Sequence, residues 1–171
     1  MIKLKQKIKI NQLKGFSMSE LLVVIALIAI MGTVVFSNFS GQKRKTALNL
    51  TTNQIGSILN EARNRAMAQD RDSNWGVYFE NSTSTTPFYA LFYSNSYSTS
   101  TTVKKYTLPD LVFYNTSTIP LGSSLTIVFN KISGKPVTLS TTTTIYLNLK
   151  RGNIILATSS ISVNLVGAIN Y

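Results

Sequence analysis

A long, predominantly apolar stretch of the chain lies near its N-terminus. Residues Leu21 to Phe36 carry no charge and are rich in Leu, Ile, Val and Ala. Counted from Phe16, the segment covers 21 residues, and Glu20 is its one charged residue. A helix needs about 20 residues to cross a hydrocarbon core of ~30 Å. The pattern therefore predicts that residues 16–40 form a membrane-spanning half of a long helix.

Beyond Gly41 the apolar residues recur at helical spacings of three, four and seven. This is the pattern of an amphipathic helix with one buried face. Glu61 and Arg65 lie on the polar side, four residues apart, where opposite charges attract. The turn-forming run Asp70 to Asn74 is expected to end the helix. Residues 41–72 therefore form the predicted amphipathic half, and its apolar stripe consists of Leu48, Ile55, Ile58, Leu59, Ala62 and Ala66.

From Trp75 onward, short aromatic and β-branched runs alternate with Ser, Thr, Asn, Gly and Pro, which is typical of strands and turns. Tight turns are expected at 151–152 and 133–135, because their glycines accept a positive φ. The fold class is predicted to be α+β, a long N-terminal helix packed on an antiparallel β-sheet head over residues 73–171. The predicted strands are 75–79, 88–93, 103–108, 111–114, 125–129, 144–150, 153–158 and 161–166.

Composition narrows the chemistry that the chain can perform. It has no His and no Cys, so the usual metal ligands and nucleophile–base pairs are missing, and neither a metal nor a cofactor is expected. Only five acids lie outside the apolar segment, without a recognisable catalytic spacing, which argues against an enzyme. These acids are Glu61, Asp70, Asp72, Glu80 and Asp110.

Net charge is less informative than it first looks. The 17 basic and 6 acidic residues give +11, but five lysines lie within the first 14 residues. Without them the chain carries 12 − 6 = +6. A basic N-terminal segment beside an apolar run favours a cytoplasmic N-terminus, although Lys43 to Lys45 on the far side reduces this asymmetry.

The junction between the basic and apolar segments reads Lys14-Gly15-Phe16-Ser17-Met18-Ser19-Glu20. An ordinary secretory signal has its small-residue cleavage site after the apolar core, and no such site follows Phe36. An uncleaved signal anchor is the other alternative. The junction instead resembles the class III signal of type IV prepilins and pseudopilins. That signal has a basic leader, a glycine before the cleavage site, phenylalanine as the first mature residue and glutamate at the fifth.

The resemblance implies a processing and assembly pathway. A prepilin peptidase would remove leader residues 1–15 by cutting between Gly15 and Phe16 and would methylate the new amino terminus of Phe16. Glu20 would then pair with the amino terminus of a neighbouring subunit. This pairing is physically reasonable, because either charge alone would be stranded in a medium of low dielectric constant. The implied partners are membrane lipid before assembly, other pilin or pseudopilin subunits through stem-helix packing, and an inner-membrane assembly platform.

Later motifs resemble one branch of the family. Ala62-Arg63-Asn64-Arg65-Ala66, Trp75-Gly76, Phe129 to Gly134 and Ile161 to Gly167 are similar to elements of the H-type minor pseudopilins and the related T-type fimbrial proteins. The resemblance implies a pilin-like fold and a minor structural subunit. Trp75 is interpreted as a core residue, and Arg63 and Arg65 as residues of a solvated or carboxylate-paired helix face.

Three functions follow from these patterns. The leading one is a non-catalytic, single-pass subunit with a cytoplasmic N-terminus and an extracytoplasmic head, assembled into a surface or periplasmic filament. A second is a minor pilin that captures DNA during uptake, because phosphate contacts require cations. A third is a signal-anchored extracytoplasmic enzyme. The candidate DNA contacts are Lys104, Lys105, Lys131, Lys135, Lys150 and Arg151.

Overall fold

The computed structural model describes the backbone of residues 15–171 and the side chains of residues 15–33 and 42–171. Residues 1–14 of the predicted leader lie outside the described residues. The chain divides into two compact units, residues 1–40 and 41–171, and each is described by itself. We call the second unit the head.

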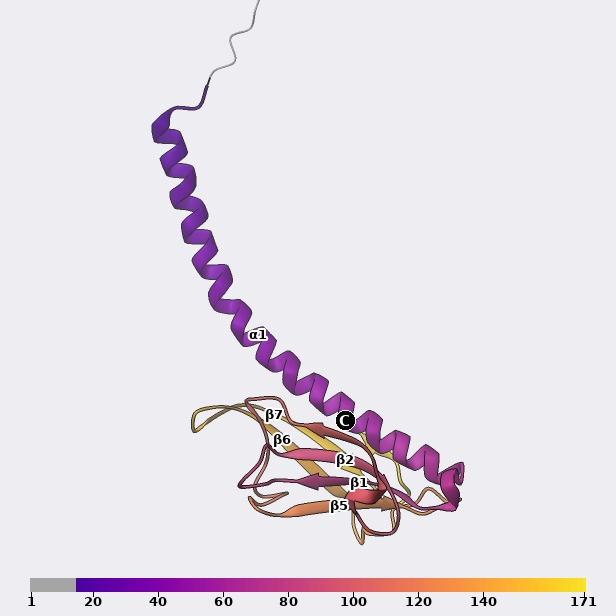
Figure 1. The fold of residues 1–171 in the computed structure, drawn as a ribbon. Coiled ribbons are helices and arrows are strands. Elements are labelled where there is room, and N and C mark those ends of the chain that lie inside the picture. The colour runs from indigo at the N-terminus through magenta and orange to yellow at the C-terminus, as the bar shows by residue number, and fades with distance from the viewer. Residues whose placement is uncertain (1–14) are drawn as a thin grey trace, which may run out of the picture. The chain divides into compact units, whose positions relative to one another are not determined.

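One helix, α1, runs from Met18 to Met67 (Figure 1). The predicted end of the helix is confirmed within a few residues. Gln69 and Arg71 adopt left-handed φ angles of 55° and 58°, which an α-helix cannot continue through. A short 3₁₀ turn, η1, over Asp70–Asp72 then leads into the first strand.

The head contains two four-stranded antiparallel sheets (Figure 1). The first has the order β3-β2-β1-β5, and the second has the order β4-β6-β7-β8. A 3₁₀ turn, η2, over Thr99–Thr101 precedes β3. The strands are β1 (Trp75–Glu80), β2 (Phe88–Tyr93), β3 (Thr102–Thr107), β4 (Val112–Tyr114), β5 (Ser124–Phe129), β6 (Thr143–Arg151), β7 (Ile154–Val163) and β8 (Ile169–Asn170).

The α+β prediction is confirmed, and most strands lie where the sequence places them. One predicted break is wrong. The segments 153–158 and 161–166 are not two strands, because Ser159 and Ser160 pair with Leu147 and Tyr146 inside the continuous strand β7. Serine is a frequent turn residue, but the long partner strand β6 keeps both residues in the sheet. Strand β8, which pairs with the end of β7, has no counterpart in the prediction.

The predicted turns are confirmed. Gly152 has a φ of 61° in the two-residue loop that joins β6 to β7, and Gly134 has a φ of 62° in the turn after β5. The amide of Gly134 donates to the carbonyl of Asn130 at 2.9 Å and closes that turn. Both positions need the left-handed backbone that glycine adopts at little cost.

The core of the head lies between α1 and the inner faces of both sheets. Every residue of the predicted apolar stripe on the helix is buried, which confirms the amphipathic assignment. Trp75, in the first sheet, is fully buried in the same cluster, which confirms its interpretation as a core residue. Tyr114 joins the sheets, because its buried hydroxyl donates to the carbonyl of Phe88 at 3.0 Å. A single apolar core therefore holds helix and sheets together.

The outer face of the first sheet is also covered. Phe88, Phe92 and Val128 are buried on this face, although α1 packs on the other one. The ring of Tyr97, from the loop before β3, stacks on Tyr78 with a centroid separation of 3.8 Å and meets Phe92 edge-on at 5.6 Å. The Ser- and Thr-rich loop of residues 94–101 thus lays an aromatic side chain over the sheet.

Candidate functional site

The start of α1 is capped by Ser17. Its hydroxyl oxygen accepts a hydrogen bond from the backbone amide of Glu20 at 3.2 Å, and its carbonyl accepts one from Leu21 at 3.1 Å. Glu20 is thus the third helical residue, in a Ser-x-x-Glu arrangement typical of a helix N-terminus. A carboxylate here is favoured by the helix dipole. The sequence reading missed this local role of Glu20, although the Ser-x-x-Glu spacing indicates it.

The predicted cleavage residues lie just before the helix. Gly15 and Phe16 are exposed, and Phe16 keeps 80% of its surface accessible. A peptidase that must hold an extended chain can reach a bond in such a position without unfolding a helix. The geometry is compatible with the cleavage predicted there.

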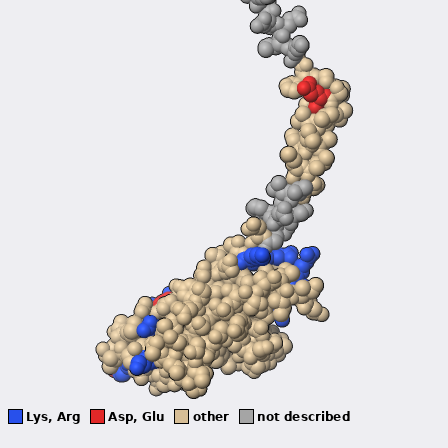
Figure 2. Space-filling view, turned by 180° about the vertical axis from the view of Figure 1, so that it is seen from behind, with Lys and Arg blue, Asp and Glu red and all other residues tan. Residues whose placement is uncertain are grey.

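The apolar part of α1 exposes its side chains in every direction. From Met18 to Met31 each large hydrophobic side chain keeps 42% or more of its surface accessible. Glu20 is the one acid among them (Figure 2). A helix that is hydrophobic all round needs lipid or other helices as its surroundings. Among the residues that the structure describes, no helix combines the length and the apolarity that crossing a membrane requires.

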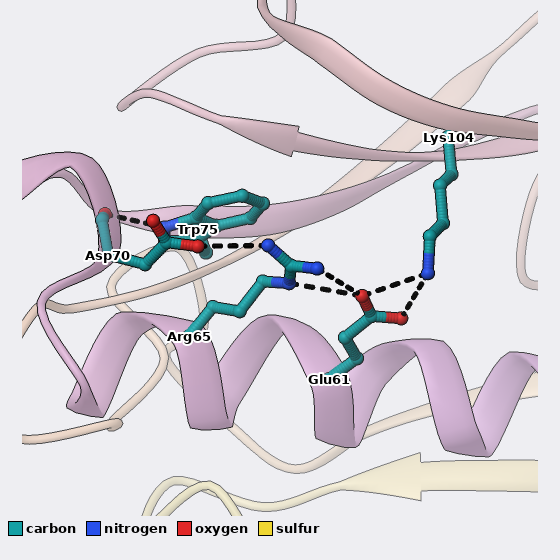
Figure 3. Close-up of polar contacts among 5 residues, drawn as sticks. All are labelled: Glu61, Arg65, Asp70, Trp75 and Lys104. Carbon is teal, nitrogen blue, oxygen red and sulfur yellow. Dashed lines mark hydrogen bonds and ion pairs between the residues drawn. The ribbon is translucent and has the colours of Figure 1, made fainter.

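A second polar arrangement ties α1 to the first sheet of the head (Figure 3). Arg65 donates from Nε and Nη2 to Glu61 at 3.0 and 2.8 Å and from Nη1 to Asp70 at 2.9 Å. Its guanidinium also lies over the ring of Trp75, at 4.8 Å from the centroid. The Trp75 indole donates to the backbone carbonyl of Asp70 at 2.9 Å. The predicted Glu61–Arg65 pair is therefore part of a larger network.

Lys104 of β3 completes this network. Its ammonium lies 3.0 Å from both carboxylate oxygens of Glu61. Partial burial raises the pKa of the Glu61 carboxyl, but hydrogen bonds from Lys104 and Arg65 outweigh this effect and hold the pKa below its ordinary value. Glu61 thus stays ionised and links helix to strand, which is a structural task.

The six candidate DNA contacts are not gathered in one place. Lys104 and Lys131 form ion pairs with Glu61 and Asp72. Lys105 lies over the ring of Phe88 at 3.7 Å, on the opposite face of β3 from Lys104, and Lys150 lies near Phe113 at the edge of the second sheet. On the face seen in Figure 2, the Lys and Arg residues of the head occur in separate groups. The structure brings no continuous phosphate track together from these residues.

Four of the five acids outside the helix start make side-chain contacts within the head. Glu61 and Asp70 bind Arg65, and Asp72 binds Lys131 at 2.8 Å. The hydroxyl of Tyr78 donates to Glu80 at 3.1 Å. Glu61 and Asp70 both line one open hollow beside α1, but Arg65 hydrogen-bonds to both carboxylates, so neither is a free acid or base of the kind that acid–base chemistry needs.

Comparison with known proteins bears on the N-terminal part of the chain. A family model described as the prokaryotic N-terminal methylation motif matches residues 11–36. The match covers the predicted cleavage bond, Glu20 and the apolar part of α1, and it supports the class of type IV pilins and pseudopilins. It includes no residue of the head. Searches of curated proteins and of solved structures found no match.

Proposed function

We propose that this chain is a non-catalytic structural subunit of a type IV pilus or of a type II secretion pseudopilus. One observation carries the proposal. A methylation motif over residues 11–36 includes the first part of α1, whose apolar side chains are exposed on all sides. Such a helix is suited to lipid before assembly and to the stems of other subunits afterwards.

The pathway follows from the motif. A prepilin peptidase removes residues 1–15 and methylates Phe16, and an inner-membrane platform transfers the subunit into the filament. Before transfer, residues 16–40 anchor the chain with its N-terminus in the cytoplasm. Residues 41–72 hold the β-rich part of the head, residues 73–171, outside. The division between residues 40 and 41 supports this assignment.

We further propose that the subunit is a minor one of the H type. The head motifs that resemble this branch meet in space. A Cβ atom on Gly167 would lie 3.1 Å from Nε of Arg63, and one on Gly134 would lie 3.3 Å from Cγ of Arg63. Three separate motifs therefore build one local structure, which supports the resemblance. A minor subunit of this kind would act at the start or the tip of the filament.

Processing provides the direct test. The full chain, expressed in membranes with and without a prepilin peptidase, is analysed by intact mass spectrometry. The expected product begins at Phe16 and carries one methyl group, and Gly15→Ala abolishes its formation. A matched control is Gly32→Ala, because a Cβ at either glycine meets nothing within 4 Å. A wild-type chain that stays full length, or a mature chain that begins elsewhere, overturns the proposal.

DNA capture is retained as the alternative function for a T-type subunit. Lys105, Lys135 and Arg151 are exposed and form no ion pair with a carboxylate of the described residues. They lie on different elements of the head, so the alternative requires DNA to contact dispersed cations. The salt dependence of binding distinguishes the two functions.

A further inference from the structure

The helical part of the head begins with three consecutive cations, Lys43, Arg44 and Lys45. Arg44 is half-buried and Lys45 is exposed, and neither forms an ion pair with a carboxylate of the described residues. On the face seen in Figure 2, Lys and Arg side chains gather at this end of the head without an acid among them. Assembly through the stem helix leaves this cluster without a task.

The turn between β6 and β7 lies toward the same end of the head. A Cβ on Gly167 would lie 3.1 Å from Nε of Arg63, and one on Gly56 would collide with the ring of Tyr171. The segment from Gly167 to Tyr171, which includes β8, therefore runs toward the start of α1. Because β7 is antiparallel to β8, Ile154 lies at the end of β7 that is nearer to the start of the helix (Figure 1).

The lengths of the two elements agree with this placement. From Ile154 to Val163, β7 spans about 30 Å at ~3.3 Å per residue. The same distance back along α1 from Arg63 is about 20 residues at ~1.5 Å per residue, and fewer where strand and helix cross at an angle. The turn between β6 and β7 thus lies level with the first two helical turns of the head, which contain the three cations.

This turn combines cations with exposed aliphatic side chains. Lys150 and Arg151 precede it, and neither forms an ion pair with a carboxylate of the described residues. Ile154, Ile155 and Leu156 follow it and keep 67%, 52% and 47% of their surface accessible. Exposed aliphatic side chains beside cations are typical of segments that lie at a membrane surface.

Few acids lie at this end of the head. Asp110 is near the turn, because the amide of Lys150 donates to the carbonyl of the next residue, Leu111, at 2.9 Å. Glu80, the last residue of β1, accepts a hydrogen bond from Tyr78. Against the five cations, these two acids leave a net charge of 5 − 2 = +3. The ion pairs of the described residues involve the other three acids of the head, Glu61, Asp70 and Asp72.

We propose that this end of the head is a contact face for the anionic headgroups of the membrane that anchors the chain. The proposal rests on the proposed function, because an anchor over residues 16–40 places the next residues of the chain at the bilayer surface. The cations are spread over two elements, which suits a surface with many phosphates better than a single bound phosphate. The contact face consists of Lys43, Arg44, Lys45, Lys150, Arg151, Ile154, Ile155 and Leu156.

The contact has a defined strength and salt dependence. Each cation close to an anionic membrane surface strengthens binding about fivefold, and the effect is screened by salt. The aliphatic side chains after the turn would enter the boundary between headgroups and acyl chains. Before assembly, the head would therefore lie against the membrane, and its entry into a filament would require release from the headgroups.

A fluorescent probe on either end of the head tests the contact. The chain contains no cysteine, so Ile155→Cys and Ile132→Cys each provide one labelling site for the polarity-sensitive fluorophore NBD. Ile132 is the matched control, because it is also exposed but lies at the other end of the head, where its amide donates to the carbonyl of Ala66. The labelled full chains are reconstituted in nanodiscs of phosphatidylcholine, with or without phosphatidylglycerol.

The expected result is a blue shift of the Ile155 probe, and quenching by lipid spin-labelled at its headgroup, in the anionic nanodiscs only. High salt should reverse both, and the Ile132 probe should not respond. Arg44→Gln with Lys45→Gln should lower the ratio of contacting to free heads about 25-fold. Arg71→Gln with Lys135→Gln, the same change of charge at the other end of the head, should leave this ratio unchanged.

Several outcomes overturn the contact face. They are an Ile155 probe that stays in water in anionic nanodiscs, equal responses of the two probes, and equal responses in anionic and neutral nanodiscs. A response in neutral nanodiscs to added glycerol phosphate also overturns it, since the site would then bind a free phosphate. A chain that does not enter nanodiscs at all overturns both this proposal and the anchor. A chain that enters them with both probes in water overturns the contact face alone.

Discussion

The ammonium of Lys104 lies 3.0 Å from each carboxylate oxygen of Glu61, and this contact joins β3 to α1. Substitution Glu61→Gln keeps the shape of the side chain but removes the charge that Lys104 and Arg65 share. We expect the free energy of unfolding to fall by about 1–2 kcal/mol, because hydrogen bonds to charged groups are worth that much when partly buried. Chemical denaturation at neutral pH measures the change.

The lowered pKa of Glu61 predicts that the stability of the fold depends on pH. The pKa of Glu61 is lower in the folded chain than its ordinary value of 4.5. The unfolded chain therefore takes up a proton first as the pH falls. The stability that Glu61 contributes is complete above that ordinary value and is lost as the pH falls through the lowered folded-state pKa. Thermal unfolding of Glu61→Gln should therefore depend less on pH in this range than that of the wild type.

Two substitutions at the start of α1 separate the assembly role that we propose for Glu20 from its role at the start of the helix. Glu20→Ala should be cleaved normally and enter filaments poorly, because it removes the carboxylate that we propose pairs with the amino terminus of a neighbouring subunit. Ser17→Ala removes only the cap, at a cost of about 1 kcal/mol to the helix end. It should therefore be incorporated. Quantification of both variants in sheared filaments measures the difference, and equal defects would mean that Glu20 acts only through the helix start.

Substitution of Gly76 is expected to cause a packing defect in the first sheet. A Cβ at this position would lie 2.7 Å from the carbonyl oxygen of Ile127 and 2.9 Å from the ring of Phe92. The backbone of β5 cannot withdraw without losing its pairing with β1, so Gly76→Ala should cost about 3 kcal/mol. Gly152→Ala, where a Cβ meets no atom within 4 Å, should cost about 1 kcal/mol through its positive φ alone. The denaturation midpoints of both variants test this order.

The basic residues give a prediction about DNA. Because the six candidate contacts lie on different parts of the head and two are held in ion pairs, we expect no salt-sensitive binding of duplex DNA. Fluorescence anisotropy of the purified chain at two salt concentrations measures this. Binding that weakens steeply with salt, and that is reduced in Lys105→Ala and Arg151→Ala, would support the DNA-capture alternative instead.

Local patterns in the sequence predicted the helix and its buried stripe correctly, because each depends on spacing within one segment. Leu48 through Ala66 follow the helical period, and all the stripe residues are buried. The division of the strands into two sheets depends on pairing between distant segments, which no local pattern records. For the same reason Ser159 and Ser160 were wrongly placed in a turn, since their strand state is set by β6.

The site was predictable to a similar degree. The junction at Gly15 and Phe16 is a contiguous motif and could be found by reading alone. The meeting of Arg63 with Gly134 and Gly167 joins residues that are far apart in sequence, and it required coordinates. The stacking of Tyr97 on Tyr78 was equally hidden, because its loop consists largely of Ser and Thr, which gives no packing signal.

The central position of β1 in its sheet has a consequence for the proposed export of the head. Its partner β2 follows directly, but β5, which pairs Phe129 with Trp75, comes much later in the chain. During passage through a translocation channel, the head would stay unfinished until that late strand emerges, because closing so long a loop costs entropy before the pairing repays it. Until β5 emerges, the edge of β1 that pairs with it would remain exposed to chaperones on the far side of the membrane.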